Sequence, residues 1–213
     1  MTLGPPSPRA FQFVADLLLG NDAKVRLRLT RFFAAAAVYA FCSAIAVLAV
    51  WWKLSDPLVA AVLCAINLVA TLGFYVAMRS GWSKRFSDPA MTMPQMVFAI
   101  VAISYSYAAA APVRGAVTLL MALVLVFGAF TVSQRNCRRL GWLAVCGLAI
   151  VMAVGSVRSP EVFAPRIEVI HFLLSAAVLS VIAAVAGELS ALRALQQTQK
   201  LELRNALDKV RQL

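Results

Sequence analysis

The stretch VIHFLLSAAVLSVIAAVAG at residues 169–187 carries no charged residue, and ELSALRALQQTQKLELRNALDKVRQL follows it directly at 188–213. At about 1.5 Å of rise per residue, a helix over the first segment is long enough to cross a hydrocarbon layer about 30 Å thick. The second segment contains neither Pro nor Gly and is rich in strong helix formers. One continuous helix is therefore predicted to cross a membrane and continue into water.

Five further uncharged runs of similar length precede this stretch, and the chain as a whole is strongly apolar. Its mean hydropathy is +0.83 and 62% of its residues are hydrophobic, which excludes an ordinary water-soluble domain. We therefore expect an all-α, polytopic membrane protein with six transmembrane helices, the last of which continues into a cytoplasmic coiled-coil helix. The six runs are Phe32–Trp52, Pro57–Met78, Gln95–Val113, Gly115–Gln134, Leu140–Val157 and Val169–Gly187.

The basic residues lie between these runs and predict the topology. With the N-terminus inside, 16 of the 20 Lys and Arg residues fall in the inner segments 1–31, 79–94, 135–139 and 188–213. This bias predicts that both termini are cytoplasmic. A net charge of +11 could also indicate nucleic acid, but charges placed beside membrane spans fit the lipid bilayer better, so no nucleic-acid partner is expected.

Three regions are expected along the chain. Residues 1–31 form an amphipathic and basic N-terminal segment, residues 32–187 the six-helix domain, and residues 188–213 a cytoplasmic signalling helix. The inner segment at 79–94 contains Asp88-Pro89, which favours an Asx turn. The four cysteines have neither disulfide nor metal-ligand spacing; three fall within spans and Cys137 falls in the predicted inner loop at 135–139.

The polar segment after the last run has a heptad pattern that predicts a parallel homodimer. The first register has the seam Leu189, Leu192, Gln196, Gln199, Leu203, Ala206, Val210 and Leu213. A second register keeps Leu189, Gln196, Leu203 and Val210 but replaces the other members with Arg193, Lys200 and Leu207. Because neither seam is clearly more apolar, a modest rotation of the helix could change the register. The alternative is a solvated tail helix.

No catalytic motif or metal-ligand cluster is visible, so the sequence assigns no catalytic residue and leaves enzymatic activity open. Two groups of polar residues lie within or beside the spans. Asn67 and Thr71 are expected to form interhelical hydrogen bonds. The candidates for a ligand pocket near the outer surface are Tyr105, Tyr107, Glu168, His171 and Ser175. Alternatively, His171 bridges two helices and the tyrosines belong to the outer aromatic belt.

Several short stretches are similar to a known family. They are Asn67, Phe74-Tyr75, Arg79-Ser80-Gly81, Arg85-Phe86, Asp88-Pro89, Gln95 and the terminal NALDKVRQL at 205–213. Together they resemble the six-span membrane-associated sensor (MASE-type) regions of bacterial GGDEF diguanylate cyclases. The resemblance implies a location in the bacterial inner membrane. It also implies that a cyclase domain follows a segment like this one, uses GTP and Mg²⁺, and makes cyclic di-GMP. No GGDEF signature is present in these residues.

The expected function is therefore that of a homodimeric membrane sensor that detects a small periplasmic or membrane-soluble ligand. It would transmit the signal through its last helix to a cytoplasmic output domain. Similar sensors precede histidine kinases and class III adenylyl cyclases, which are alternative outputs. A small six-helix transporter is the remaining alternative.

Overall fold

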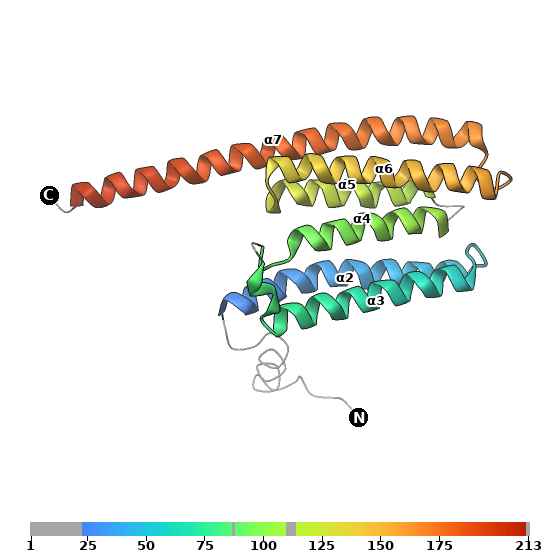
Figure 1. The fold of residues 1–213 in the computed structure, drawn as a ribbon, viewed down its shortest axis with the longest axis horizontal. Helices are drawn as coiled ribbons and strands as arrows, with labels where there is room; N and C mark the ends of the chain where they lie inside the picture. The colour runs from blue at the N-terminus through green and yellow to red at the C-terminus, as the bar shows by residue number, and fades with distance from the viewer. Residues whose placement is uncertain (1–22, 87, 110–113, 212–213) are drawn as a thin grey trace, which may run out of the picture. The chain divides into compact units, whose positions relative to one another are not determined.

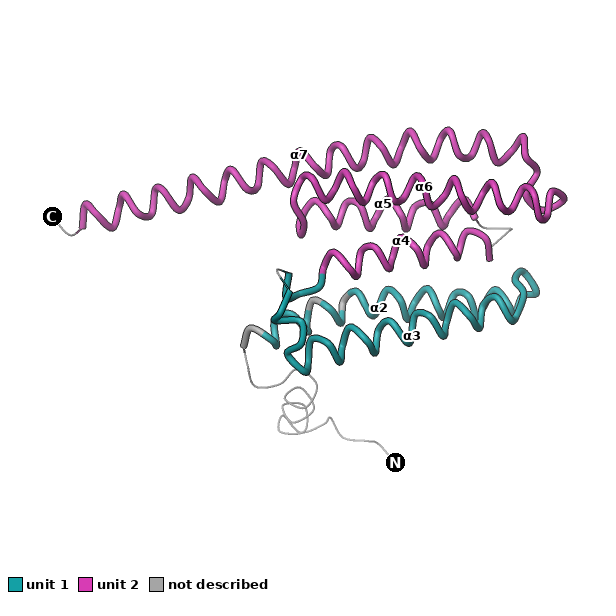
Figure 2. The backbone as a smooth tube through the Cα atoms, viewed as in Figure 1, with its two compact units in different colours: residues 1–91 teal, residues 92–213 magenta. Residues whose placement is uncertain are grey.

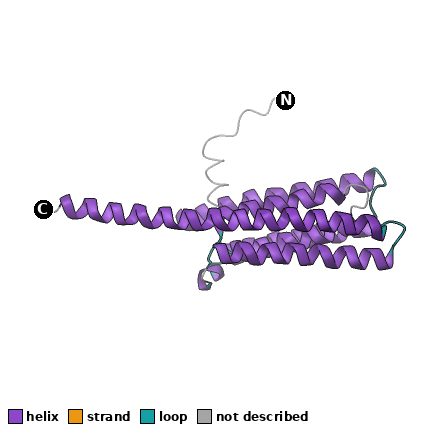
Figure 3. Ribbon diagram, turned by 90° about the horizontal axis from the view of Figure 1, so that it is seen from above, coloured by secondary structure: helices purple, strands orange, loops and turns teal. Residues whose placement is uncertain are grey.

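The computed structural model describes residues 23–86, 88–109 and 114–211, and all regular secondary structure within them is helical (Figure 3). The long helices lie where the apolar runs predict them (Figure 1). The chain divides into two compact units, Met1–Met91 and Thr92–Leu213 (Figure 2). The elements are α2 (Ala23–Trp51), α3 (Pro57–Arg79), the 3₁₀ helix η1 (Trp82–Arg85), α4 (Thr92–Ala109), α5 (Arg114–Thr131), α6 (Gln134–Arg158) and α7 (Pro165–Arg211).

Five of the described helices, namely α2, α3, α5, α6 and α7, are long and apolar enough to cross a membrane. The third expected span, α4, is not among them. It begins with a polar first turn that includes Gln95, and Ser104 to Tyr107 interrupt its apolar composition. The last residues of the predicted run, 110–113, lie outside the described part of the chain.

The first unit contains the antiparallel pair α2 and α3. The side chain of Asp56 caps α3, because its Oδ1 accepts hydrogen bonds from Leu58 N at 2.7 Å and Val59 N at 3.3 Å. Pro57 occupies the first helical position, where its missing N–H costs nothing. This short, capped connection brings α3 back along α2.

The predicted boundary between residues 31 and 32 lies inside a helix, and a division of the chain at this point stays a prediction. Helix α2 already begins at Ala23, so the basic segment that includes Arg26 and Arg28 belongs to the same helix as the first apolar run. Val25 and Leu29 are buried together with Phe32 and pack with Met78, which extends the apolar face of the helix into this basic segment. The rest of the predicted N-terminal segment lies outside the described residues.

The connection between α3 and α4 has the expected irregular backbone. Gly81 has a φ of 77°, the left-handed conformation that glycine adopts most easily, and it precedes η1. Asp88 Oδ1 accepts a hydrogen bond from Ala90 N at 3.1 Å, which is the Asx turn predicted from Asp88-Pro89. The Trp82 ring packs edge-on against Phe86.

The second unit is a four-helix arrangement of α4, α5, α6 and α7. Helices α5 and α6 each contact both α4 and α7, so α4 and α7 occupy opposite corners (Figure 1). One continuous apolar core runs between the helices. It consists of Met96, Ile100, Tyr107, Val117, Met121, Leu125, Leu140, Ala144, Leu148, Met152, Phe163, Leu179 and Ala183.

The prediction of an inner loop at 135–139 is wrong, because these residues form the start of α6. Ser133 is the N-cap residue of the helix, with an extended backbone, and its carbonyl accepts a hydrogen bond from Cys137 N at 2.9 Å. Cys137 is therefore a helical residue, 2% exposed, that packs with Ala129 and Ala186. The reversal between α5 and α6 is tighter than the charge pattern suggested.

Helices α6 and α7 approach each other closely where small residues meet. A Cβ built on Gly141 of α6 would lie far inside the contact distance of Ala183 Cβ on α7. The Ala183 Cβ is fixed to its backbone and cannot rotate away. The distance between these helices therefore depends on glycine at position 141.

Gly141→Ala should destabilise the second unit because α6 and α7 must move apart or distort, at a cost of about 1–3 kcal/mol. Thermal unfolding of the purified protein in detergent measures this as a lower midpoint. Gly73→Ala in α3 is the matched control, since a Cβ there meets nothing within 4 Å and alanine is the better helix former. An equal drop for both variants would contradict the close-approach argument.

Candidate functional site

At one end of the second unit, α4 finishes, α5 begins and the turn between α6 and α7 leads into α7. Four side chains meet there and are named the Glu168 cluster: Tyr107, Arg114, Phe163 and Glu168. Tyr107 is 1% exposed and Glu168 is 4% exposed. The cluster is thus a buried polar group within an apolar bundle, and its members come from three helices and one turn.

Both oxygens of the Glu168 carboxylate have a partner. Tyr107 Oη donates a hydrogen bond to Oε2 at 2.8 Å, and Arg114 Nη1 donates to Oε1 at 2.8 Å. A carboxylate buried without such partners would be very unfavourable, because it loses its hydration. Since α4 and α7 occupy opposite corners, the long Tyr107 side chain reaches across the bundle to make its bond.

Arg114 is held by more than its ion pair. Its Nη2 donates to the carbonyl of Val162 at 2.6 Å, and its guanidinium lies 4.4 Å from the centroid of the Phe163 ring. A Cβ on Gly155 would lie 2.7 Å from that ring, so glycine at 155 makes room for Phe163. The cluster therefore connects the beginning of α5, the α6–α7 turn and the beginning of α7.

His171 lies one helical turn after Glu168 on α7 and is half-buried. Its Nδ1 is buried and has no hydrogen-bond partner among the described residues. An unpaired buried polar atom costs about 1–3 kcal/mol, so a group that bonds to Nδ1 would gain affinity. This unpaired ring nitrogen, one helical turn from Glu168 along α7, is the clearest candidate for a ligand contact at this end of the unit.

The structure brings together two of the five predicted pocket residues, Tyr107 and Glu168. Tyr105 is half-buried and, being two residues from Tyr107, points to a different side of α4. Ser175 is half-buried one turn beyond His171. A shared cavity that includes Tyr105, His171 and Ser175 stays a prediction.

Sequence reasoning missed Arg114, which it counted as an outer-loop charge. In the structure it is the first residue of α5 and the ionic partner of Glu168. The sequence does contain a signal for this pair, because Arg114 and Glu168 carry opposite charges and were both expected near the outer surface. Phe163 was also missed, because nothing in the spacing indicates that the turn folds over Arg114.

At the opposite end of the second unit, two residues of α7 bond to the end of α5 and to the turn that follows it. They are named the Ser190–Arg193 clamp. Ser190 Oγ donates to the carbonyl of Val132 at 2.6 Å, and Arg193 Nη1 donates to the carbonyl of Ala129 at 3.0 Å. Arg193 also lies 5.8 Å from the Phe130 ring centroid. The last carbonyls of a helix lack intrahelical donors and attract cations, so Arg193 suits the end of α5.

Glu188 adds a more exposed contact at the same level. Its Oε1 accepts a hydrogen bond from Gln134 Nε2 at 2.9 Å and lies 3.7 Å from Arg138 Nη2. Exposed pairs of this kind contribute little to stability. The buried Ser190, which is 6% exposed, and Arg193 are therefore the stronger attachment of α7 at this end.

Asn67 and Thr71, the two polar residues predicted to bond between helices, make different kinds of hydrogen bond. Asn67 is buried and its Nδ2 donates across helices to Ser43 Oγ at 3.1 Å. Thr71 instead donates to the Asn67 carbonyl within α3 at 2.7 Å, the bond that a hydroxyl commonly makes to the preceding turn. Ser43 was not predicted as the partner in α2.

No group of His, Cys, Asp and Glu residues that could hold a metal ion occurs among the described residues. No family model, no curated protein and no solved structure matches this chain. The features that bear on function are the Glu168 cluster, the Ser190–Arg193 clamp and the helix that joins them.

The Glu168 cluster should behave as one energetic unit. Glu168→Leu or Arg114→Leu alone leaves a buried charge without its partner, which costs about 3–5 kcal/mol. The double variant Arg114→Leu/Glu168→Leu removes both charges and should be more stable than either single variant. Thermal unfolding of the parent protein, both single variants and the double variant in detergent measures the coupling energy between the two side chains.

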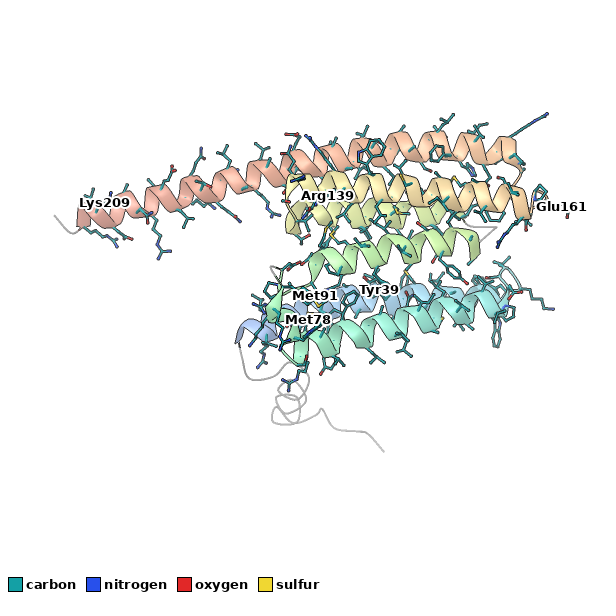
Figure 4. All side chains as sticks on the ribbon, in the orientation of Figure 1. Tyr39, Met78, Met91, Arg139, Glu161 and Lys209 are labelled. Atoms are coloured by element: carbon teal, nitrogen blue, oxygen red, sulfur yellow. The ribbon has the colours of Figure 1, made fainter. Side chains whose placement is uncertain are left out.

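Glu161→Leu is the matched control for this cycle, since Glu161 is an exposed carboxylate at the same end of the unit (Figure 4). It should leave the unfolding midpoint nearly unchanged. Strictly additive effects of the two single variants would show that the pair is not coupled.

Proposed function

We propose that this chain is a membrane-embedded sensor and signal-transmission region that controls a cytoplasmic output domain. The observation that carries the proposal is the continuity of α7, which runs for 47 residues from Pro165 to Arg211. At 1.5 Å per residue it is about 70 Å long, roughly twice the hydrocarbon thickness. It begins at the Glu168 cluster, passes the Ser190–Arg193 clamp and extends beyond the other helices of its unit (Figures 1 and 2).

The part of α7 beyond the clamp supports a homodimer. Every residue from 194 to 211 is exposed, including Leu203 at 63% and Val210 at 70%. A lone helix of this length is marginally stable in water, and its exposed leucines favour pairing. A parallel second copy covers them with the same heptad seam.

The two possible registers differ at the clamp. The register that includes Arg193, Lys200 and Leu207 directs Arg193 toward the partner helix. In the structure Arg193 is bonded to α5 instead, which favours the register through Leu192, 56% exposed. In the proposed mechanism, release of Arg193 lets α7 rotate toward the second register, which is the two-state element that a switch requires.

The input is proposed to be a small periplasmic or membrane-soluble molecule that binds beside the Glu168 cluster. The free Nδ1 of His171 would bond to it, and competition for Glu168 would change the attachment of α7 to Tyr107 and Arg114. Because α7 is one helix, a shift at this end acts on the clamp at the other. The coupling is thus mechanical and needs no catalytic group in this chain.

The proposed output follows the resemblance to MASE-type sensors. A diguanylate cyclase that uses GTP and Mg²⁺ and makes cyclic di-GMP is the first candidate, since two catalytic domains must meet and dimer geometry can control this. The output domain of a histidine kinase or a class III adenylyl cyclase would be driven through the same helix. A small transporter remains the alternative, favoured only by the number of membrane-crossing helices.

The proposed setting is the bacterial inner membrane, with α4 as a sixth span and both termini cytoplasmic. The charge distribution supports this orientation. Arg138 and Arg139 lie near the beginning of α6, and Glu161 follows its other end (Figure 4). The Ser190–Arg193 clamp would then face the cytoplasm and the Glu168 cluster the outer side.

A cysteine introduced at position 138 should be protected from an impermeant maleimide in intact cells and become labelled after permeabilisation. One introduced at position 161 should be labelled in intact cells. The background replaces the four native cysteines, and position 84, in η1, serves as a second inner site. Labelling of position 138 or 84 in intact cells would contradict the predicted cytoplasmic location of these residues.

With the chain joined after Leu213 to a diguanylate cyclase catalytic domain, Arg193→Ala should change cellular cyclic di-GMP about fivefold or more, in either direction. The physical reason is that it removes the bond to the Ala129 carbonyl and the contact with Phe130. Arg204→Ala is the control, because Arg204 is exposed and off both seams.

Equal product levels for Arg193→Ala, Arg204→Ala and the parent protein, at equal amounts in the membrane, would exclude transmission through the clamp. Solute flux through proteoliposomes containing the purified chain would then favour the transporter.

A further inference from the structure

The part of α7 from Leu189 onward is named the exit segment, and its heptad seam the exit seam. The stripe of residues that continues this seam toward the beginning of α7 is also exposed. Towards the N-terminus from Leu189 and Leu192, the same side of the helix carries apolar residues that are more than half exposed. They are Val185 at 53%, Val181 at 63%, Val178 at 54% and Leu174 at 63%. These residues lie within the apolar stretch of α7 that is expected to cross the membrane.

This stripe faces away from the rest of the second unit. The opposite side of α7 carries the buried residues Leu179, Ala183, Ala186 and Ser190, followed by Arg193, which is bonded to α5. At 100° per residue, Val181 and Val185 project about 160–200° from Ala183. A partner can therefore approach along the stripe without displacing α5 or α6.

We propose that a second copy of α7 packs along Leu174, Val178, Val181 and Val185, so that the dimer seam starts inside the membrane and continues into the exit segment. This inference rests on the proposed dimeric function. It follows from the continuity of α7, since no break separates Val185 from Leu192. Two straight helices that pair along residues 189–210 remain close to each other over the neighbouring turns.

The spacing of the stripe fits this geometry. The exit segment has alternating steps of four and three residues, typical of a left-handed coiled coil. The steps from Val181 to Val185 and from Val185 to Leu189 are both four residues, which inserts an eleven-residue repeat over 178–189. Such an insertion locally unwinds the supercoil. The two helices therefore run nearly straight in the membrane and wind around each other outside it.

A competing face exists on the same helix. Ala177, Ser180 and Ala184 are exposed and small, and small residues often mark helix contacts in membranes. This row lies about 100° around the helix from the valine stripe, so it does not continue into the Leu192 and Leu203 seam. It provides matched control positions of similar depth and exposure.

Disulfide crosslinking in native membranes tests the proposal, with the full chain and its four native cysteines replaced. Single cysteines at 178, 181 and 185 should give several-fold more crosslinked dimer than single cysteines at 180 and 184. Position 203 reports the exit segment independently. The oxidant, its concentration and the time are the same for all positions.

Three outcomes of this experiment would contradict the proposal. Crosslinking at 203 without crosslinking at 178, 181 and 185 would overturn the inference, leaving lipid on the stripe and the exit dimer intact. Stronger crosslinking at 180 and 184 would assign the membrane contact to the small-residue row and also overturn it. No crosslinking at any position, 203 included, would overturn the proposed dimer itself.

Discussion

The buried carboxylate of Glu168 is the constraint on which the second unit depends. An ionised group inside an apolar bundle is tolerated only when every oxygen is bonded, and here Tyr107 and Arg114 supply those bonds. Meeting this requirement fixes the end of α4, the beginning of α5 and the beginning of α7 at one point. It also requires the turn at Phe163 to cover Arg114, which in turn requires glycine at 155.

From the Glu168 cluster onward, α7 is one uninterrupted helix that ends at Arg211. Close packing against Gly141 sets its distance from α6, and the Ser190–Arg193 clamp sets its rotation at the other end of the bundle. Beyond the clamp, every residue of α7 from 194 to 211 is exposed, so no described part of the chain covers it. A helix that is fixed at both ends of the bundle and free beyond it suits transmission, because a change at the first attachment must move the free end or break the second attachment.

The two ends differ in how readily they can change. The Glu168 cluster is buried and bidentate, so rearranging it needs a ligand that replaces its bonds, for which the open Nδ1 of His171 is a candidate contact. The clamp consists of one hydroxyl and one guanidinium that donate to neutral backbone carbonyls, so its release leaves no buried carboxylate without a partner. The difference favours the clamp as the place where small forces change the orientation of the exit segment.

The sequence alone determined the all-helical class, the positions of the long helices and the unbroken last helix, because apolar run length and helix propensity are local properties. It also placed Tyr107 and Glu168 among the site candidates. Tertiary structure decided the partners: Arg114 with Glu168, Ser43 with Asn67, and Arg193 with the Ala129 carbonyl. It also showed that 135–139 is helical and that α2 begins at Ala23. These depend on which helices are neighbours and how each is rotated, and packing between distant segments sets both.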